Sequence, residues 1–170
     1  MSKIELVAPC HFGLEAVLKK EILDLGYEIV KVEDGRVTFC GEAEMLCRAN
    51  VFLRTAERIL LKVGSFKAMT FEELFEKIKA LPWESYIPSD GKFWVAEASS
   101  VKSKLFSPSY IQSIVKKAIV ERLKTIYHVE WFSETGAEYP IRISFMKDEA
   151  CVCLDTTGLS LHKRGYRTMV

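Results

Sequence analysis

Six Lys and Arg side chains lie between residues 100 and 124 of this 170-residue chain, against a single acid, Glu121. The whole chain has 24 Lys and Arg and 23 Asp and Glu, so this stretch alone makes the net charge positive. Lysines mixed with serine, glutamine and tyrosine are typical donors to phosphate oxygens and sugar hydroxyls, which indicates a nucleic-acid site. The candidate contacts in this stretch are Lys102, Lys104, Ser109, Tyr110, Lys116, Lys117 and Lys124.

A predicted helix over residues 108–126 positions most of these side chains. Ser107 is a favourable N-cap, and Pro108 suits the first helical position because its missing N–H costs nothing there. The unpaired N–H groups and the dipole at such a helix start favour a phosphate. The apolar stripe of the helix consists of Ile111, Ile114, Val115, Ala118, Ile119, Leu123 and Ile126, which Arg122 interrupts. The alternative is an ordinary core helix with a solvated lysine face.

Two aromatic residues flank Pro108. Phe106 and Tyr110 could offer their rings to unpaired bases, or they could belong to the hydrophobic core. We expect Phe106 to lie in the core, and both alternatives stay open for Tyr110.

Basic residues also gather in two other places. Arg48, Arg54 and Arg58 form a second basic group, for which surface pairing with Glu44 and Glu57 is the alternative. Residues 155–170 are polar, contain glycine and lack periodicity, which is typical of a disordered terminus or of a connector. The basic residues of this tail complete the candidate contacts: Lys163, Arg164 and Arg167.

Motifs for other chemistries are missing from the sequence. It contains no glycine-rich nucleotide loop, no G-x-S-x-G nucleophile motif and no C-x-x-C pair. Cys151 and Cys153 are predicted to share one face of a strand, where we interpret them as small apolar residues. We therefore assign no catalytic residue and no metal ligand.

The composition is that of a cytoplasmic globular protein. An apolar content of 49% is ample for a core, and a net charge of +1 excludes a uniformly basic nucleic-acid binder but not a local basic patch. Five cysteines, an odd number, favour reduced thiols over a disulfide framework. We expect no membrane segment, because no apolar run reaches 18 residues and no signal-peptide pattern is present.

The elements fall into two groups, which predict an α+β fold. Strands over 4–9, 27–32, 36–40 and 58–66 alternate with helices over 12–25 and 42–52 in the order βαββαβ, that of ferredoxin-like folds. The second group reads α-β-α-β-β and begins with a capping box at Thr70 and Glu73. We expect domains over 1–67 and 68–156, followed by a connector over 157–170.

Four segments carry a resemblance to a known family. Residues 10–15, 48–58, 70–75 and 161–167 read CHFGLE, RANVFLRTAER, TFEELF and LHKRGYR. They resemble the THUMP-domain class I RNA methyltransferases, which include the guanine-N2 methyltransferases of bacterial large-subunit ribosomal RNA. Members are often labelled predicted N6-adenine-specific DNA methylases. The resemblance extends over the whole chain in register.

The resemblance implies a ferredoxin-like subdomain, then an α/β THUMP domain that binds RNA, and then a Rossmann-like domain that binds S-adenosylmethionine. This sequence lacks the glycine-rich cofactor loop and the N/D-P-P motif of the catalytic domain, so no catalytic or cofactor residue can be carried over. We expect the RNA-recognition part of a larger methyltransferase, or a stand-alone relic of one. Its expected partners are structured RNA, ribosomal in kind, and its own methyltransferase domain. The alternatives are a protein-interaction module that uses the basic face, a self-sufficient enzyme, and a methylase of the N6-adenine type.

Overall fold

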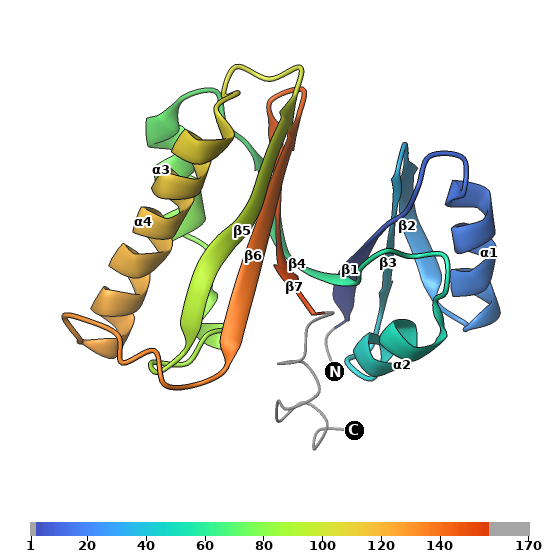
Figure 1. Ribbon diagram of the computed structural model, residues 1–170, viewed down its shortest axis with the longest axis horizontal. Coiled ribbons are helices and arrows are strands. Elements are labelled where there is room, and N and C mark those ends of the chain that lie inside the picture. Colours follow the sequence, from blue (N-terminus) through green and yellow to red (C-terminus); the bar gives the residue numbers. More distant parts are fainter. Residues whose placement is uncertain (1–2, 157–170) are drawn as a thin grey trace. The chain divides into compact units, whose positions relative to one another are not determined.

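The computed structural model describes residues 3–156, which form two compact units (Figure 1). The first unit contains the described residues up to Lys62 together with Asp155 and Thr156, and the second is Val63–Leu154. The expected connector over 157–170 lies outside the described residues, and so do Lys163, Arg164 and Arg167.

The first unit contains the elements of the predicted ferredoxin-like fold. Its strands run in the spatial order β2-β3-β1-β4, and the pairs β2–β3, β3–β1 and β1–β4 are antiparallel. The order of elements along the chain confirms the predicted βαββαβ pattern. The elements are β1 (Ile4–Pro9), α1 (Glu15–Asp24), β2 (Glu28–Glu33), β3 (Arg36–Gly41), α2 (Met45–Phe52) and the start of β4 (Leu60–Lys67).

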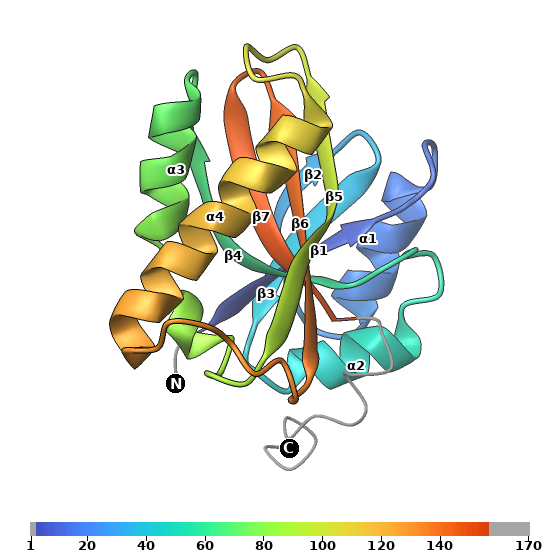
Figure 2. The same cartoon turned by 60° about the vertical axis from the view of Figure 1, so that its left-hand side comes forward.

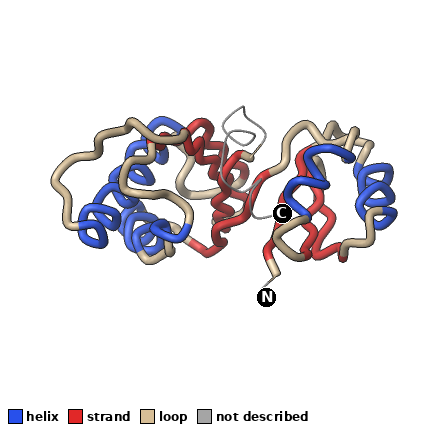
Figure 3. Tube along the Cα trace, turned by 90° about the horizontal axis from the view of Figure 1, so that it is seen from below, coloured by secondary structure: helices blue, strands red, loops and turns tan. Residues whose placement is uncertain are grey.

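The core of the first unit is formed by side chains of its sheet and its two helices, the elements that Figure 3 draws in red and blue. Alternate residues of β1 and β3 point to this side, because side chains of a strand alternate between its faces. Leu6, Val37 and Phe39 come from the strands, and Leu18 and Ile22 come from α1; all are fully buried.

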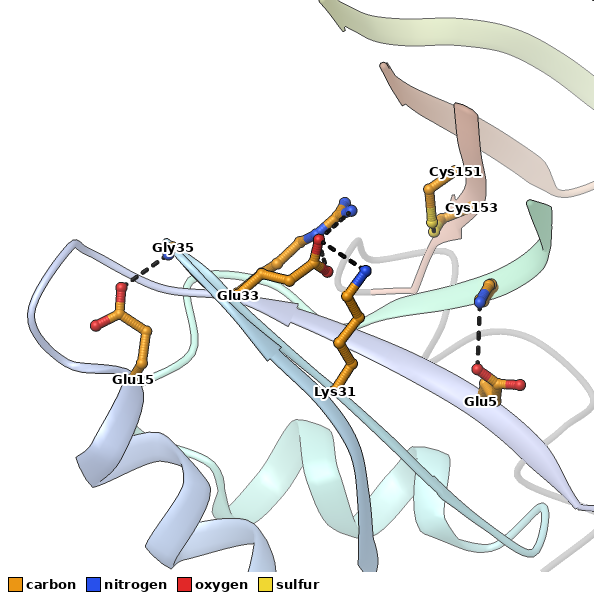
Figure 4. Close-up of polar contacts among 9 residues, drawn as sticks. Glu5, Glu15, Lys31, Glu33, Gly35, Cys151 and Cys153 are labelled. Carbon is orange, nitrogen blue, oxygen red and sulfur yellow. Dashed lines mark hydrogen bonds and ion pairs between the residues drawn. The ribbon is translucent and has the colours of Figure 1, made fainter. Parts of the chain in front are cut away.

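Helix α1 begins at Glu15. The apolar spacing predicts a start at Phe12, which is wrong. Gly13 adopts φ +95°, a left-handed conformation that breaks the helix before Glu15. The Glu15 carboxylate accepts hydrogen bonds from Gly13 N at 2.9 Å and Gly35 N at 2.8 Å, the second of which Figure 4 shows. Phe12 is therefore left 81% exposed on the loop before the helix.

The second unit confirms the predicted order α-β-α-β-β. The elements after β4 are α3 (Phe71–Lys79), the 3-10 turn η1 (Trp83–Ser85), β5 (Lys92–Val101), α4 (Pro108–Tyr127), β6 (Glu138–Met146) and β7 (Glu149–Asp155). The strands are ordered β4-β7-β6-β5, with β5 parallel to β6 and β6 antiparallel to β7. Because β5 continues to Val101, Ser100 belongs to this strand.

Helix α4 crosses one face of this sheet with α3 beside it (Figure 2). Most of its predicted apolar stripe is fully buried: Ile111, Val115, Ala118, Ile119 and Leu123. The capping box of α3 is confirmed, since Thr70 Oγ1 accepts a hydrogen bond from Glu73 N at 3.1 Å.

Arg122, the polar interruption in the stripe, anchors α4 to the segment after α3. Its Nε and Nη2 donate to the two carboxylate oxygens of Glu84 at 2.7 and 2.8 Å, and Nη1 donates to Lys79 O at 3.0 Å. Next to it, the buried Trp83 indole donates to Ile78 O at 2.8 Å. These contacts hold α4 against α3 and the segment that follows it.

Candidate nucleic-acid interface

The loop between β5 and α4 is held by the turn between β6 and β7. Lys104 N donates to the Asp148 carboxylate at 2.7 Å, and Asp148 N donates to Ser103 Oγ at 2.8 Å. Lys147 N donates to Val101 O at 3.0 Å. At the loop's other side, Ser100 Oγ donates to Leu105 O at 2.5 Å. These hydrogen bonds hold the loop in a fixed conformation, although most of its residues are exposed or only partly buried.

This bracing brings three lysines together at one end of the second unit. Lys102 and Lys104 come from the β5–α4 loop and Lys147 from the β6–β7 turn, and all three are exposed. Sequence reasoning missed Lys147, which lies 43 residues beyond Lys104. Lys147 reaches this end through the pairing of β5 with β6, which the sequence alone does not specify.

Two aromatic side chains lie beside these lysines. Phe106 is 76% exposed, so the expectation that it belongs to the core was wrong. Its neighbour Leu105 is buried instead. Tyr110 is 55% exposed and stacks on Phe71, the first residue of α3, with ring centroids 4.4 Å apart. We refer to these six residues as the tip: Phe71, Lys102, Lys104, Phe106, Tyr110 and Lys147.

The start of α4 has the predicted backbone but not the predicted cap. Ser107 adopts extended dihedrals and Pro108 is the first helical residue. Within residues 3–156, however, the Ser107 side chain makes no capping hydrogen bond. Ser109 is exposed in the first turn of the helix.

Lys116 does not share the solvated face with the other lysines of α4. Its Nζ donates to Phe93 O on β5 and lies 3.9 Å from the centroid of the Phe93 ring. One turn earlier, Gln112 Nε2 donates to Val95 O at 3.3 Å. Burial lowers the pKa of Lys116, and the charge of Glu134 opposes that shift in part. Its ammonium group is therefore turned toward the protein.

Lys117 and Lys124 are exposed, seven residues apart and so close to one face of the helix. Helix α4 has 20 residues, which corresponds to a length of about 30 Å. The tip lies at its first end and Lys124 lies in its last turn, so the candidate contacts spread along the helix.

Two arginines of the second basic group contact other residues of the first unit. Arg48 Nη1 donates to the Tyr27 hydroxyl at 3.1 Å, and its guanidinium lies over the Tyr27 ring. Arg58 pairs with Asp155 at 2.9 Å, whereas Arg54 is exposed. The one acid in these contacts is Asp155, and not the predicted Glu44 or Glu57.

The cysteines and histidines in the described part of the chain form no recognisable metal site. As predicted, Cys151 and Cys153 lie side by side on β7, with their Sγ atoms 3.8 Å apart (Figure 4). His11 Nε2 lies 2.9 Å from the Glu57 carboxylate. Among residues 3–156, no group of three or more His, Cys, Asp or Glu side chains could hold a metal ion. No helix in the same range is long and apolar enough to cross a membrane.

Two domain families match this chain. The RlmL ferredoxin-like domain matches residues 5–60, and the THUMP domain matches residues 68–155.

Longer proteins resemble the chain over nearly its whole length. The Bacillus subtilis protein named "Putative RNA methyltransferase YpsC" is 55% identical over 98% of this chain and 43% of its own length. The ribosomal RNA large subunit methyltransferase K/L of Ectopseudomonas mendocina is 32% identical over 97% of this chain and 23% of its own. The solved structure of SMU.472, described as "a putative methyltransferase complexed with SAH", is 48% identical with a TM-score of 0.87, over 98% of this chain and 45% of that chain. This chain thus spans less than half the length of these relatives.

Proposed function

The chain belongs to the THUMP-domain family and carries an RlmL ferredoxin-like domain before it; from this we propose that it is the RNA-docking part of an S-adenosylmethionine-dependent RNA methyltransferase. The observation that carries the proposal is the exposed lysine set of the second unit. These lysines lie on the tip and along α4, in a chain whose net charge is only +1.

The proposed mechanism is positioning. Lys102, Lys104, Lys117 and Lys124 contact phosphates, and such contacts set the register and orientation of a nucleic acid without reading its sequence. A structured RNA held in this way presents one base to a tethered catalytic domain. We include Lys163, Arg164 and Arg167 as further contacts on the grounds of the sequence alone.

Within this proposal the substrate is ribosomal RNA and the methylated atom is guanine N2. The K/L relative supports ribosomal RNA, and the SAH-bound relative supports S-adenosylmethionine as the methyl donor. No residue of this chain is assigned to the cofactor, because the sequence has neither a glycine-rich cofactor loop nor a Pro-Pro pair. The proposed contribution of this chain is RNA binding and orientation.

Charge reversal on α4 tests the proposal. We expect the double variant Lys117→Glu and Lys124→Glu to weaken binding to a ribosomal RNA hairpin. The slope of log affinity against log salt should become shallower by about 1.4 to 1.8, the effect of two lost phosphate contacts. The matched control reverses two exposed lysines of the first unit, Lys19→Glu and Lys20→Glu, and should retain the original slope.

Fluorescence anisotropy over a salt series measures both quantities. An RNA affinity that does not change with salt, or equal losses in the two double variants, would exclude phosphate docking on α4. A DNA hairpin of the same sequence, used as competitor, separates RNA recognition from a general attraction to nucleic acid, because only RNA offers 2′-hydroxyls.

A further inference from the structure

We infer that the tip binds unpaired nucleotides, whose bases stack on Phe106 and on Tyr110. The inference rests on the proposed RNA-docking function and adds to it the kind of RNA segment that the tip contacts. The inference gives the tip a different role from the outer face of α4, where the exposed lysines provide phosphate contacts alone.

The two rings are presented in a way that suits stacking. Phe106 follows the buried Leu105, whose carbonyl oxygen is fixed by Ser100 Oγ, and the ring itself stays in solvent. Tyr110 is covered on one side by Phe71 at 4.4 Å, with 29° between the ring planes, yet more than half of the residue is exposed. A base placed on Tyr110 would extend an existing stack. Aromatic rings held in this way are platforms for bases of any sequence.

The positive charges of the tip suit a nucleic acid, but nearby carboxylates offset part of them. Lys102, Lys104 and Lys147 are exposed on adjoining turns. Two nearby carboxylates accept backbone hydrogen bonds: Asp148 from Lys104 N at 2.7 Å and Glu73 from Met69 N at 3.2 Å. Glu72 and Glu149 are exposed close by and offset part of the positive charge. Binding at the tip should therefore depend on ring stacking more than on salt.

A base pair inside a duplex cannot stack on such rings, because the neighbouring base pairs cover both of its faces. The major groove of A-form RNA is also too deep and narrow for side chains to reach the bases. Bases that are splayed out from loops, bulges and ends expose a face that can stack on an aromatic side chain. The exposed rings thus favour an unpaired segment over a continuous helix.

The test compares two RNA hairpins with the same stem, one blunt and one with an unpaired tail that carries 2-aminopurine. We expect the wild-type chain to bind the tailed hairpin more tightly and to quench the 2-aminopurine fluorescence. Phe106→Ala should weaken binding to the tailed hairpin about fivefold to a hundredfold, the range for loss of one stacked base. It should leave blunt-hairpin binding unchanged and reduce the quenching, because Tyr110 remains as a second stacking ring. Phe106→Trp should retain both.

Trp131→Ala is the matched control, because Trp131 is a 74% exposed aromatic residue of the same unit that lies beyond the other end of α4. Equal binding of the two hairpins, or equal effects of Phe106→Ala and Trp131→Ala, would overturn the inference while leaving salt-dependent docking on α4 intact. Loss of the salt dependence, or equal losses in the two lysine double variants, would instead contradict the proposed function.

Discussion

Lys116 and Lys117 are adjacent in the sequence, and we predict that replacing them has opposite consequences. Lys116→Met should destabilise the fold and leave RNA affinity almost unchanged. Lys117→Met should weaken RNA binding and leave stability unchanged. The reason is that the Lys116 ammonium contacts Phe93 O and the Phe93 ring, whereas Lys117 lies in solvent.

The size of the Lys116 effect follows from its contacts. A hydrogen bond from a charged group contributes about 1.5–3 kcal/mol, and a cation over an aromatic ring about 0.5–2 kcal/mol. The cost of desolvating the ammonium group opposes both, and Met keeps most of the packing of the side chain. We therefore expect a net loss of about 1–2 kcal/mol, which lowers Tm by about 2–8 °C for a chain of this size. An exposed substitution such as Lys117→Met should stay within about 0.5 kcal/mol.

Urea unfolding followed by tryptophan fluorescence measures the first quantity, and anisotropy with the ribosomal RNA hairpin measures the second. Unchanged stability of Lys116→Met together with a lost phosphate contact would refute this assignment.

Two other predictions concern contacts that position α4 and the tip. Arg122→Met should cost about 1–3 kcal/mol, because it leaves a half-buried carboxylate without its paired donors. The hydrogen bonds from Arg122 lower the pKa of Glu84. The stabilisation by this pair should therefore be present above the ordinary carboxylate pKa, and it should be lost as the pH falls through the pKa of Glu84 in the folded chain. Equal acid stability of wild type and Glu84→Gln would contradict this. Asp148→Ala should release the β5–α4 loop and weaken binding of the tailed hairpin. Asp148→Asn should bind as wild type does, because asparagine keeps an acceptor and tolerates the φ of +67° at this position. Hydrogen exchange at Lys104 N measures the release of the loop directly.

The parts of the fold that depend on local chemistry could be predicted from the sequence. Pro108 after Ser107 located the start of α4, and the Thr70–Glu73 capping box located the start of α3. In each case the residues that decide the structure lie within one helical turn of each other. The start of α1 was predicted three residues too early, because the apolar spacing continued through Gly13, whose left-handed φ ends any helix.

The parts of the site that depend on distant segments could not be predicted in the same way. Phe106 and Leu105 are adjacent apolar residues, and only the tertiary packing decides which of them is buried. The contact of Lys116 with Phe93 O joins residues 23 apart, and a lysine on a helix face gives no sign of it. Lys147 joins the tip through a strand pairing that a single sequence does not specify.

The carbonyl contacts of Gln112 and Lys116 have a consequence for the behaviour of the protein in concentrated solution. Strand β5 is the outermost strand of its sheet among the described residues, and an outermost strand with unpaired carbonyls can recruit a strand from another molecule. Two of these carbonyls, on Phe93 and Val95, are already occupied by side chains from α4. The helix thereby closes part of the sheet to growth by addition of further strands, which protects the protein against aggregation at this edge.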